Sequence, residues 1–147
     1  MGEAPGFGDC AGFNTRRAAR LVGQVYDHAL EPTGLMNTQF SALAILNGRG
    51  ATPISELARR MGVDRTTLTR NLKLLERRRM IKFTPGTDAR VRLVEVTAEG
   101  REGFDRAVPA WRAVQKRMIE RFGADRWQAL KAELGALSEA AAEVGER

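Results

Sequence analysis

Two short amphipathic segments separated by one glycine constrain the fold of this chain more than any other feature. Apolar residues recur at intervals of three and four on both sides of Gly62, which is the spacing that buries one face of an α-helix. They are Ile54, Leu57, Ala58 and Met61 before the glycine, and Leu68, Leu72, Leu75 and, more loosely, Leu74 after it. Gly62 suits the turn that closes the first helix, and Asp64 can cap the second. The segment therefore predicts two short helices joined by a tight turn.

The second of these helices, about Arg65–Arg77, begins with residues that are poor choices for a helix. Threonine has low helix propensity and like charges repel, yet the stretch begins DRTTLTR. With the leucines buried, the side chains left on the other faces are Arg65, Thr66, Thr67, Thr69, Arg70 and Lys73. Hydroxyl, methyl and guanidinium groups can contact base edges and phosphates. The pattern predicts a helix-turn-helix that contacts DNA; which side chains meet bases and which meet phosphates stays open.

Basic charge is concentrated in the same part of the chain. The net charge is +6, but residues 59–92 contain eleven Lys or Arg against three Asp or Glu, a local net of +8 that leaves about −2 elsewhere. A basic block confined to one segment is expected of a phosphate-binding surface; the alternative is a solvated basic face. Arg77, Arg78 and Arg79 are interpreted as a solvated helix end that complements the helix dipole.

Composition excludes several classes of function. The 147 residues fit one domain, with or without arms that need a partner, and 43% hydrophobic content is enough for a core. There is neither an apolar run of membrane-spanning length nor a signal-peptide pattern, so a soluble, cytoplasmic protein is expected. Cys10 and His28 are the single Cys and His, which excludes a disulfide framework and a cysteine-rich zinc site. No nucleophile–base pairing or Gly-rich phosphate loop is visible, so we expect no enzyme, metal or cofactor.

Helices are also predicted before this region, and a hairpin after it. Residues 1–13 are Gly-rich and are interpreted as a flexible arm, after which Asn14 can cap a helix to about Leu30. Another helix is predicted from about Thr38 to Leu46. Beyond Arg79 the apolar residues alternate on both sides of the turn sequence PGTDAR, at Ile81 and Phe83 and then at Val91, Leu93 or Val94, and Val96.

The C-terminal third of the sequence predicts two helices, the second of which needs another helix to cover its apolar side. Thr97 can cap a long helix to about Phe122, which Pro109 bends or interrupts. The last helix begins near Asp125 and has an apolar stripe at Trp127, Leu130, Leu134, Leu137, Ala141 and Val144. In a chain of this size only the first predicted helix could cover such a stripe. We therefore expect the terminal helices to pair between two chains.

Three motifs resemble the MarR family of winged-helix transcriptional regulators, and the resemblance covers about residues 14–145. GLMNTQF is similar to the family's entry to its second helix, ISELARRMGVDRTTLTRNLKLLERRRMI to its reading head, and DARVRLVEVTAEG to its wing. Met36 stands where the family often has a capping Thr, so Asn37 or Thr38 is expected to cap instead, and Val96 replaces the usual Leu.

The resemblance implies a mainly α fold with a small β-hairpin wing (α+β), a winged helix-turn-helix with N- and C-terminal dimerisation helices. Residues 1–13 would be the arm, 14–34 and 98–147 the dimerisation region, and 35–97 the DNA-binding domain. The expected partners are a second copy of the chain and a palindromic operator in double-stranded DNA. Arg90 would enter the minor groove, oriented by a charge-assisted hydrogen bond to Asp88.

The resemblance also implies a regulator, expected to be a repressor, that a small and often aromatic effector releases from DNA. The implied cleft would be lined by Val22, Tyr26, Phe40, Leu43, Phe104, Val108 and Trp111; the alternative is that these residues are only core. A redox-sensing regulator that uses Cys10 and a winged-helix module that binds protein also stay open as interpretations. The operator sequence, the effector, the regulated genes, the choice of repression or activation and the reactivity of Cys10 are not determined by the sequence.

Overall fold

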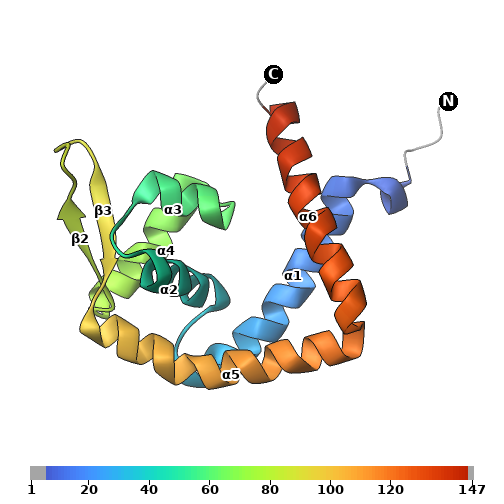
Figure 1. The fold of residues 1–147 in the computed structure, drawn as a ribbon, viewed down its shortest axis with the longest axis horizontal. Helices are drawn as coiled ribbons and strands as arrows, with labels where there is room; N and C mark the ends of the chain where they lie inside the picture. Colours follow the sequence, from blue (N-terminus) through green and yellow to red (C-terminus); the bar gives the residue numbers. More distant parts are fainter. Residues whose placement is uncertain (1–5, 146–147) are drawn as a thin grey trace. The chain divides into compact units, whose positions relative to one another are not determined.

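The computed structural model describes residues 6–145 and contains mostly helices with one small sheet (Figure 1). The described elements are η1 (Phe7–Asp9), α1 (Ala11–Leu30), η2 (Glu31–Thr33), α2 (Asn37–Arg49), β1 (Thr52–Pro53), α3 (Ile54–Met61), α4 (Arg65–Arg77), β2 (Ile81–Pro85), β3 (Arg92–Val96), α5 (Ala98–Phe122) and α6 (Ala124–Gly145). The predicted fold class, mainly α with a wing, is confirmed. No described helix combines the length and apolarity of a membrane span.

The wing is part of a three-stranded antiparallel sheet in the order β1-β3-β2. In the hairpin Ile81 pairs with Val96 and Phe83 with Val94, as the alternating pattern predicts. Thr52 of β1 pairs with Val94 on the other side of β3. The sequence did not predict β1, because two residues are too short to show a period.

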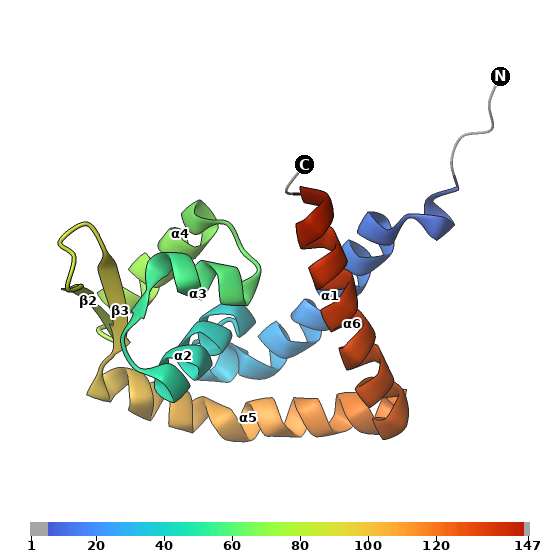
Figure 2. The same ribbon diagram turned by 45° about the horizontal axis from the view of Figure 1, so that its top comes forward.

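The chain divides into two compact units, the first ending at Trp111 and the second beginning at Arg112. In the first unit, α2, α3 and α4 gather beside the wing strands (Figure 2). Its core contains leucines from all three of these helices, each with no exposed surface: Leu43, Leu46, Leu57, Leu68, Leu72 and Leu75. Leu74 was expected to join this stripe loosely but is 41% exposed, because it follows Leu72 by two residues and so points to another face.

The first helix begins earlier than predicted. Cys10 is the N-cap of α1, and its Sγ accepts a hydrogen bond from the Phe13 N–H at 3.4 Å. Asn14, the predicted cap, lies inside the helix and donates its side-chain amide to the Gly8 and Cys10 carbonyls. The prediction of a flexible arm over residues 1–13 is therefore wrong from η1 onward, and residues 1–5 lie outside the described part.

The second helix is capped from another element. Asp27 on α1 accepts a hydrogen bond from the Asn37 N–H at 2.6 Å, and Gln39 accepts one from the Met36 N–H at 3.1 Å. Neither Asn37 nor Thr38 serves as the N-cap, a position that Met36 occupies. One of these bonds comes from α2 itself and the other from α1, and the local sequence could not reveal the second.

A tight joint connects the end of α4 to the start of α5. Arg79 adopts a left-handed conformation (φ 56°) that ends α4, and the Met80 carbonyl accepts a hydrogen bond from the Thr97 N–H at 3.0 Å. Thr97 caps α5 as predicted, accepting from the Gly100 N–H at 3.0 Å. Pro109 lies within α5, which is helical on both sides of it, so it does not interrupt this helix.

We predict that Gly100→Ala destabilises the protein through this joint. A methyl group at Gly100 would overlap the Met80 carbonyl oxygen and come within 2.7 Å of Val96 Cγ2. Because backbone must move to make room, the free energy of unfolding should fall by about 2–3 kcal/mol, measured by urea denaturation.

The matched control for that substitution is Gly48→Ala on α2, where an added methyl group has no heavy atom within 4 Å. It should leave stability unchanged or raise it by about 0.5 kcal/mol, because alanine favours helix. Equal effects of the two substitutions would contradict the proposed role of the joint.

Candidate nucleic-acid interface

Most of the residues that the sequence predicted to contact DNA lie on one face of α4. Because Leu68, Leu72 and Leu75 are turned into the core, the polar side chains of α4 face outward. Five of them line an open cavity of about 410 Å³: Arg65, Thr66, Thr69, Arg70 and Lys73. Thr67, the sixth predicted residue, is not among the lining residues.

The three threonines of this helix have different hydrogen bonds. Thr67 donates its backbone N–H to Asp64 at 2.8 Å and its hydroxyl to the other oxygen of the same carboxylate. Thr69 donates its hydroxyl to the Arg65 carbonyl at 2.7 Å. Among the described residues, the Thr66 hydroxyl has no such partner, and Thr66 is exposed. Thr66 is thus the threonine best able to offer its hydroxyl to an external group, whereas Thr67 mainly caps the helix.

The Asp64 carboxylate fixes the start of α4. The Thr67 hydroxyl and then the Thr67 N–H lower the pKa of Asp64 below its ordinary value, because both stabilise the charged form. A negative charge at this helix end also complements the helix dipole. Since the folded-state pKa is depressed, the stability from this cap is present above the ordinary pKa and is lost as the pH falls through the lowered one.

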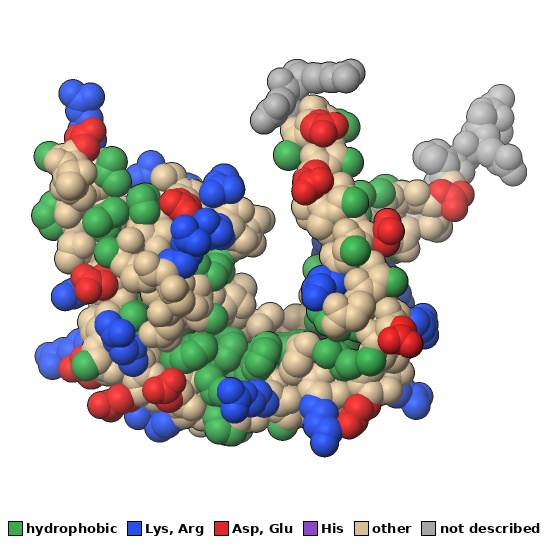
Figure 3. Space-filling view, in the orientation of Figure 1, with side chains coloured by type: hydrophobic (Ala, Val, Ile, Leu, Met, Phe, Trp, Pro, Cys, Tyr) green, Lys and Arg blue, Asp and Glu red, His purple; other side chains and the backbone are tan. Residues whose placement is uncertain are grey.

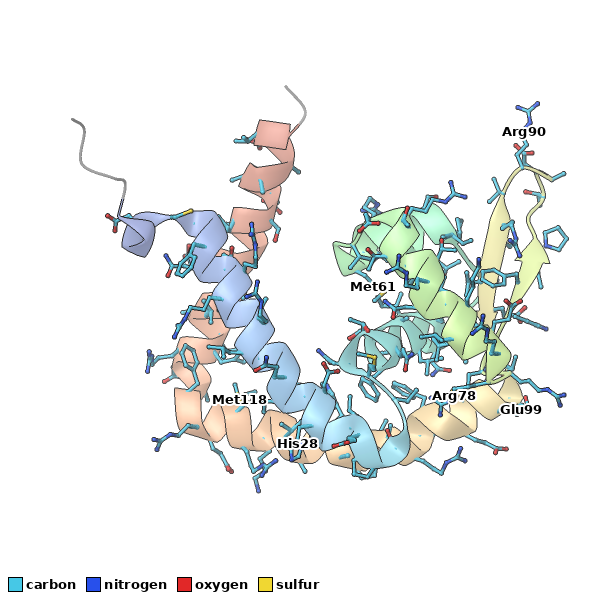
Figure 4. The ribbon with its side chains drawn as sticks, turned by 180° about the vertical axis from the view of Figure 1, so that it is seen from behind. His28, Met61, Arg78, Arg90, Glu99 and Met118 are labelled. Atoms are coloured by element: carbon cyan, nitrogen blue, oxygen red, sulfur yellow. The ribbon has the colours of Figure 1, made fainter. Side chains whose placement is uncertain are left out.

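The wing tip is ordered by a backbone contact. Asp88 Oδ1 accepts a hydrogen bond from the backbone N–H of Arg90 at 3.0 Å. The described residues show no ion pair between Asp88 and the Arg90 guanidinium; the contact that Asp88 makes with Arg90 is this backbone bond, which forms an Asx-turn. The Arg90 side chain projects away from the tip (Figure 4). It is therefore available to an external partner.

The consecutive arginines at the end of α4 are more than a solvated helix end. Arg78 donates from Nη1 to the carbonyl of Gly34, in the turn between η2 and α2. Gly34 has φ 73°, and its missing side chain lets the guanidinium approach, with Nη2 only 3.2 Å from where a Cβ would be. The Arg79 carbonyl accepts a hydrogen bond from the Thr97 hydroxyl. Arg78 and Arg79 therefore hold α4 to its neighbours.

This fold, a helix-turn-helix with a basic outer face and a wing, defines a winged-helix protein. The sequence model of the MarR family matches residues 35–91. MosR, a transcriptional regulator of M. tuberculosis whose structure contains DNA, is 47% identical with a TM-score of 0.79, over 90% of this chain and 98% of that one. The chain belongs to the MarR family.

Other relatives agree with this assignment. The transcriptional repressor CouR of Rhodococcus jostii RHA1, solved on a 23-mer DNA duplex, is 26% identical with a TM-score of 0.79, over 94% of this chain and 99% of that one. YwoH of Bacillus subtilis, an uncharacterized HTH-type transcriptional regulator, is 32% identical over 89 residues, which are 60% of this chain and 65% of YwoH. Both relatives are described as regulators of transcription.

We predict that Thr67→Val raises the pKa of Asp64 and lowers the melting temperature, because valine keeps the shape of threonine but lacks the hydroxyl that binds the carboxylate. The pKa can be followed by NMR titration of the carboxyl carbon. Thr66→Val, one residue away, is the control and should change neither quantity. If Thr67→Val left the pKa of Asp64 as low as in the parent protein, the hydroxyl would not be its main cause.

Proposed function

We propose that this protein is a dimeric, sequence-specific DNA-binding regulator that represses transcription. The observation that carries the proposal is the face of α4 made by Arg65, Thr66, Thr69, Arg70 and Lys73. An α-helix fits the major groove of B-DNA, where such side chains can meet base edges and phosphates. The DNA in the MosR and CouR structures supports this function, and CouR is described as a repressor.

Each part of the interface has a proposed role. Arg65, Thr66 and Arg70, at the start of α4, meet bases and nearby phosphates in the major groove. Lys73, one turn further on, meets the backbone. Arg90 enters the adjacent minor groove, where a guanidinium group is attracted by the negative potential. Thr67 and Asp88 support these contacts indirectly, through the helix cap and the turn at the wing tip.

We propose that the dimer is built from the terminal helices. On α6 the predicted stripe is exposed, with Leu130, Leu134 and Leu137 at 38–41%. Hydrophobic side chains are visible on the surface of this helix (Figure 3). On α1 a second set of large apolar side chains is 41–48% exposed: Phe13, Leu21, Val22 and Val25. Rows of large exposed apolar side chains are typical of protein–protein interaction sites, and a second copy of the chain would cover both rows.

The charge distribution also supports a second copy of the chain as the partner of these helices. Residues 11–26 carry three arginines and no acid, and residues 132–145 carry three glutamates and no base. Opposite charges flanking apolar stripes favour pairing of α1 from one chain with α6 from another. We therefore assign residues 14–34 and 98–147 to dimerisation and 35–97 to DNA binding, with α1 extended back to Ala11.

The proposed effector is a small aromatic molecule. Phe40 stacks on Phe104 and on Trp111, with ring centroids 4.8 and 5.8 Å apart. Phe40 and Leu43 are buried, whereas Val22 is 41% exposed, and burial raises the pKa of Tyr26. A ligand could meet Val22, Tyr26 and the edge of this aromatic group without opening the core. To release DNA it must bind more tightly to the form that cannot bind the operator.

The redox alternative depends on Cys10, which is a free and exposed thiol. Its Sγ already accepts a hydrogen bond at the start of α1, so oxidation would disturb the first turn of that helix. If Cys10→Ser left the peroxide response of DNA binding unchanged, this alternative would be excluded.

Operator binding is tested by fluorescence-anisotropy titration of duplex from the upstream region of the gene, with scrambled duplex as control. We expect a preference of roughly 10³ or more for the native duplex and an affinity that falls steeply with salt. Arg70→Ala should weaken binding without changing the melting temperature. Arg106→Ala, on α5 and paired with Glu102, is the control. Equal affinity for both duplexes would favour the protein-binding module.

Dimerisation is tested by sedimentation of two variants that add a carboxylate to α6. Leu134→Glu places the charge in the exposed apolar stripe and should produce monomers, because burying an unpaired charge is unfavourable. Ala132→Glu places the same charge on another face of the helix and should leave the dimer intact. A Leu134→Glu protein that sediments as the parent does would exclude this stripe as the interface.

A further inference from the structure

A small cavity between the start of α4 and the wing gathers arginines from both elements. Its volume is about 190 Å³, and it is lined by Pro53, Ile54, Ser55, Arg65, Arg90, Val91 and Arg92. Arg65 is the first residue of α4, and Arg92 is the first residue of β3. None of the lining residues is an Asp or Glu. The cavity is therefore positive, and it lies where α4 and the wing meet.

Among the described residues, the cavity arginines have no carboxylate partner, unlike Arg49, Arg60 and Lys82 nearby. Within residues 6–145, Arg65, Arg90 and Arg92 form no ion pair. By contrast, Glu56 binds two other arginines of this unit at 3.4 and 2.9 Å, and Lys82 on β2 lies 3.5 Å from Glu95. The unpaired side chains of Arg65 and Arg92 on the same cavity repel each other, and an anion would remove that repulsion.

Arg92 is held in place although no acid binds it. Its guanidinium carbon lies 4.4 Å from the centroid of the Phe83 ring, on the neighbouring strand. This cation–π contact restricts the side chain but leaves its N–H groups free to donate. Less rotamer entropy is then lost when an anion binds. Arg65 directly follows the N-cap Asp64 at the start of α4.

The geometry of duplex DNA identifies the anion. A sugar–phosphate strand separates the major groove from the minor groove, so a protein with α4 in one and Arg90 in the other must let that strand cross between them. We propose that this cavity binds one backbone phosphate of the operator, with Arg65 and Arg92 donating to it from opposite elements. Its lining of arginines without carboxylates suits one phosphate better than an uncharged base.

This inference rests on the proposed function, and its test separates the two. A duplex is first selected by the intact protein from a random pool, and neutral methylphosphonates then replace its phosphates one at a time. At one position in each half-site the parent protein should lose affinity by about tenfold or more. On the unmodified duplex, Arg92→Gln should lower the affinity by a similar factor. A methylphosphonate at that one position should then lower the affinity of the variant no further.

Two other variants keep the result interpretable. Arg65→Gln must act at the same phosphate as Arg92→Gln, so it replaces that variant if loss of the Phe83 contact prevents folding. Lys82→Gln removes one charge from the neighbouring strand but does not line the cavity, and its effect should not depend on any single phosphate. The inference is overturned if Arg92→Gln binds as the parent does, or if its loss is the same on every modified duplex. Failure to select any duplex would overturn the proposed function as well.

Discussion

The hydrogen bond from the Thr97 N–H to the Met80 carbonyl is the contact on which the position of α4 depends. It joins the end of α4 to the start of α5 at 3.0 Å, and the absence of a side chain at Gly100 allows the approach. Arg79 accepts a left-handed conformation at this point, which costs about 1 kcal/mol and ends the helix where the sheet begins. Close-packed interiors transmit displacement, so we expect a shift of α4 to displace the start of α5.

A second set of contacts connects α4 to the region of α1 and α2. Arg78 binds the carbonyl of Gly34, and Asp27 of α1 caps α2. A change in the end of α1 would therefore reach both the start of α2 and the end of α4. An effector bound near Tyr26 would need only to favour one arrangement of these contacts over another. Regulation by release from DNA is consistent with such coupling.

The distribution of hydrogen bonds and ion pairs separates supporting residues from those available to DNA. Asp64 and Thr67 satisfy each other, and Lys82 is paired with Glu95. Thr66 and Arg92, which are close to these residues in sequence, keep donors free for an external partner. Phosphate contacts supply affinity and register, and base contacts supply specificity. The proposed phosphate cavity would thus set the register in which α4 and Arg90 meet their grooves.

The sequence by itself determined the helices, the hairpin and the outward face of α4. These follow from apolar spacing, from Gly62 and from Asp64, and each such signal is local. Only the tertiary structure decided that Arg78 binds Gly34, 44 residues away, and that Asp27 caps α2 from 10 residues away. The strand β1 and the cavity between Arg65 and Arg92 also required it. The physical reason is that hydrogen-bond partners distant in sequence are chosen by how the helices pack, and residue periodicity carries no information about that choice.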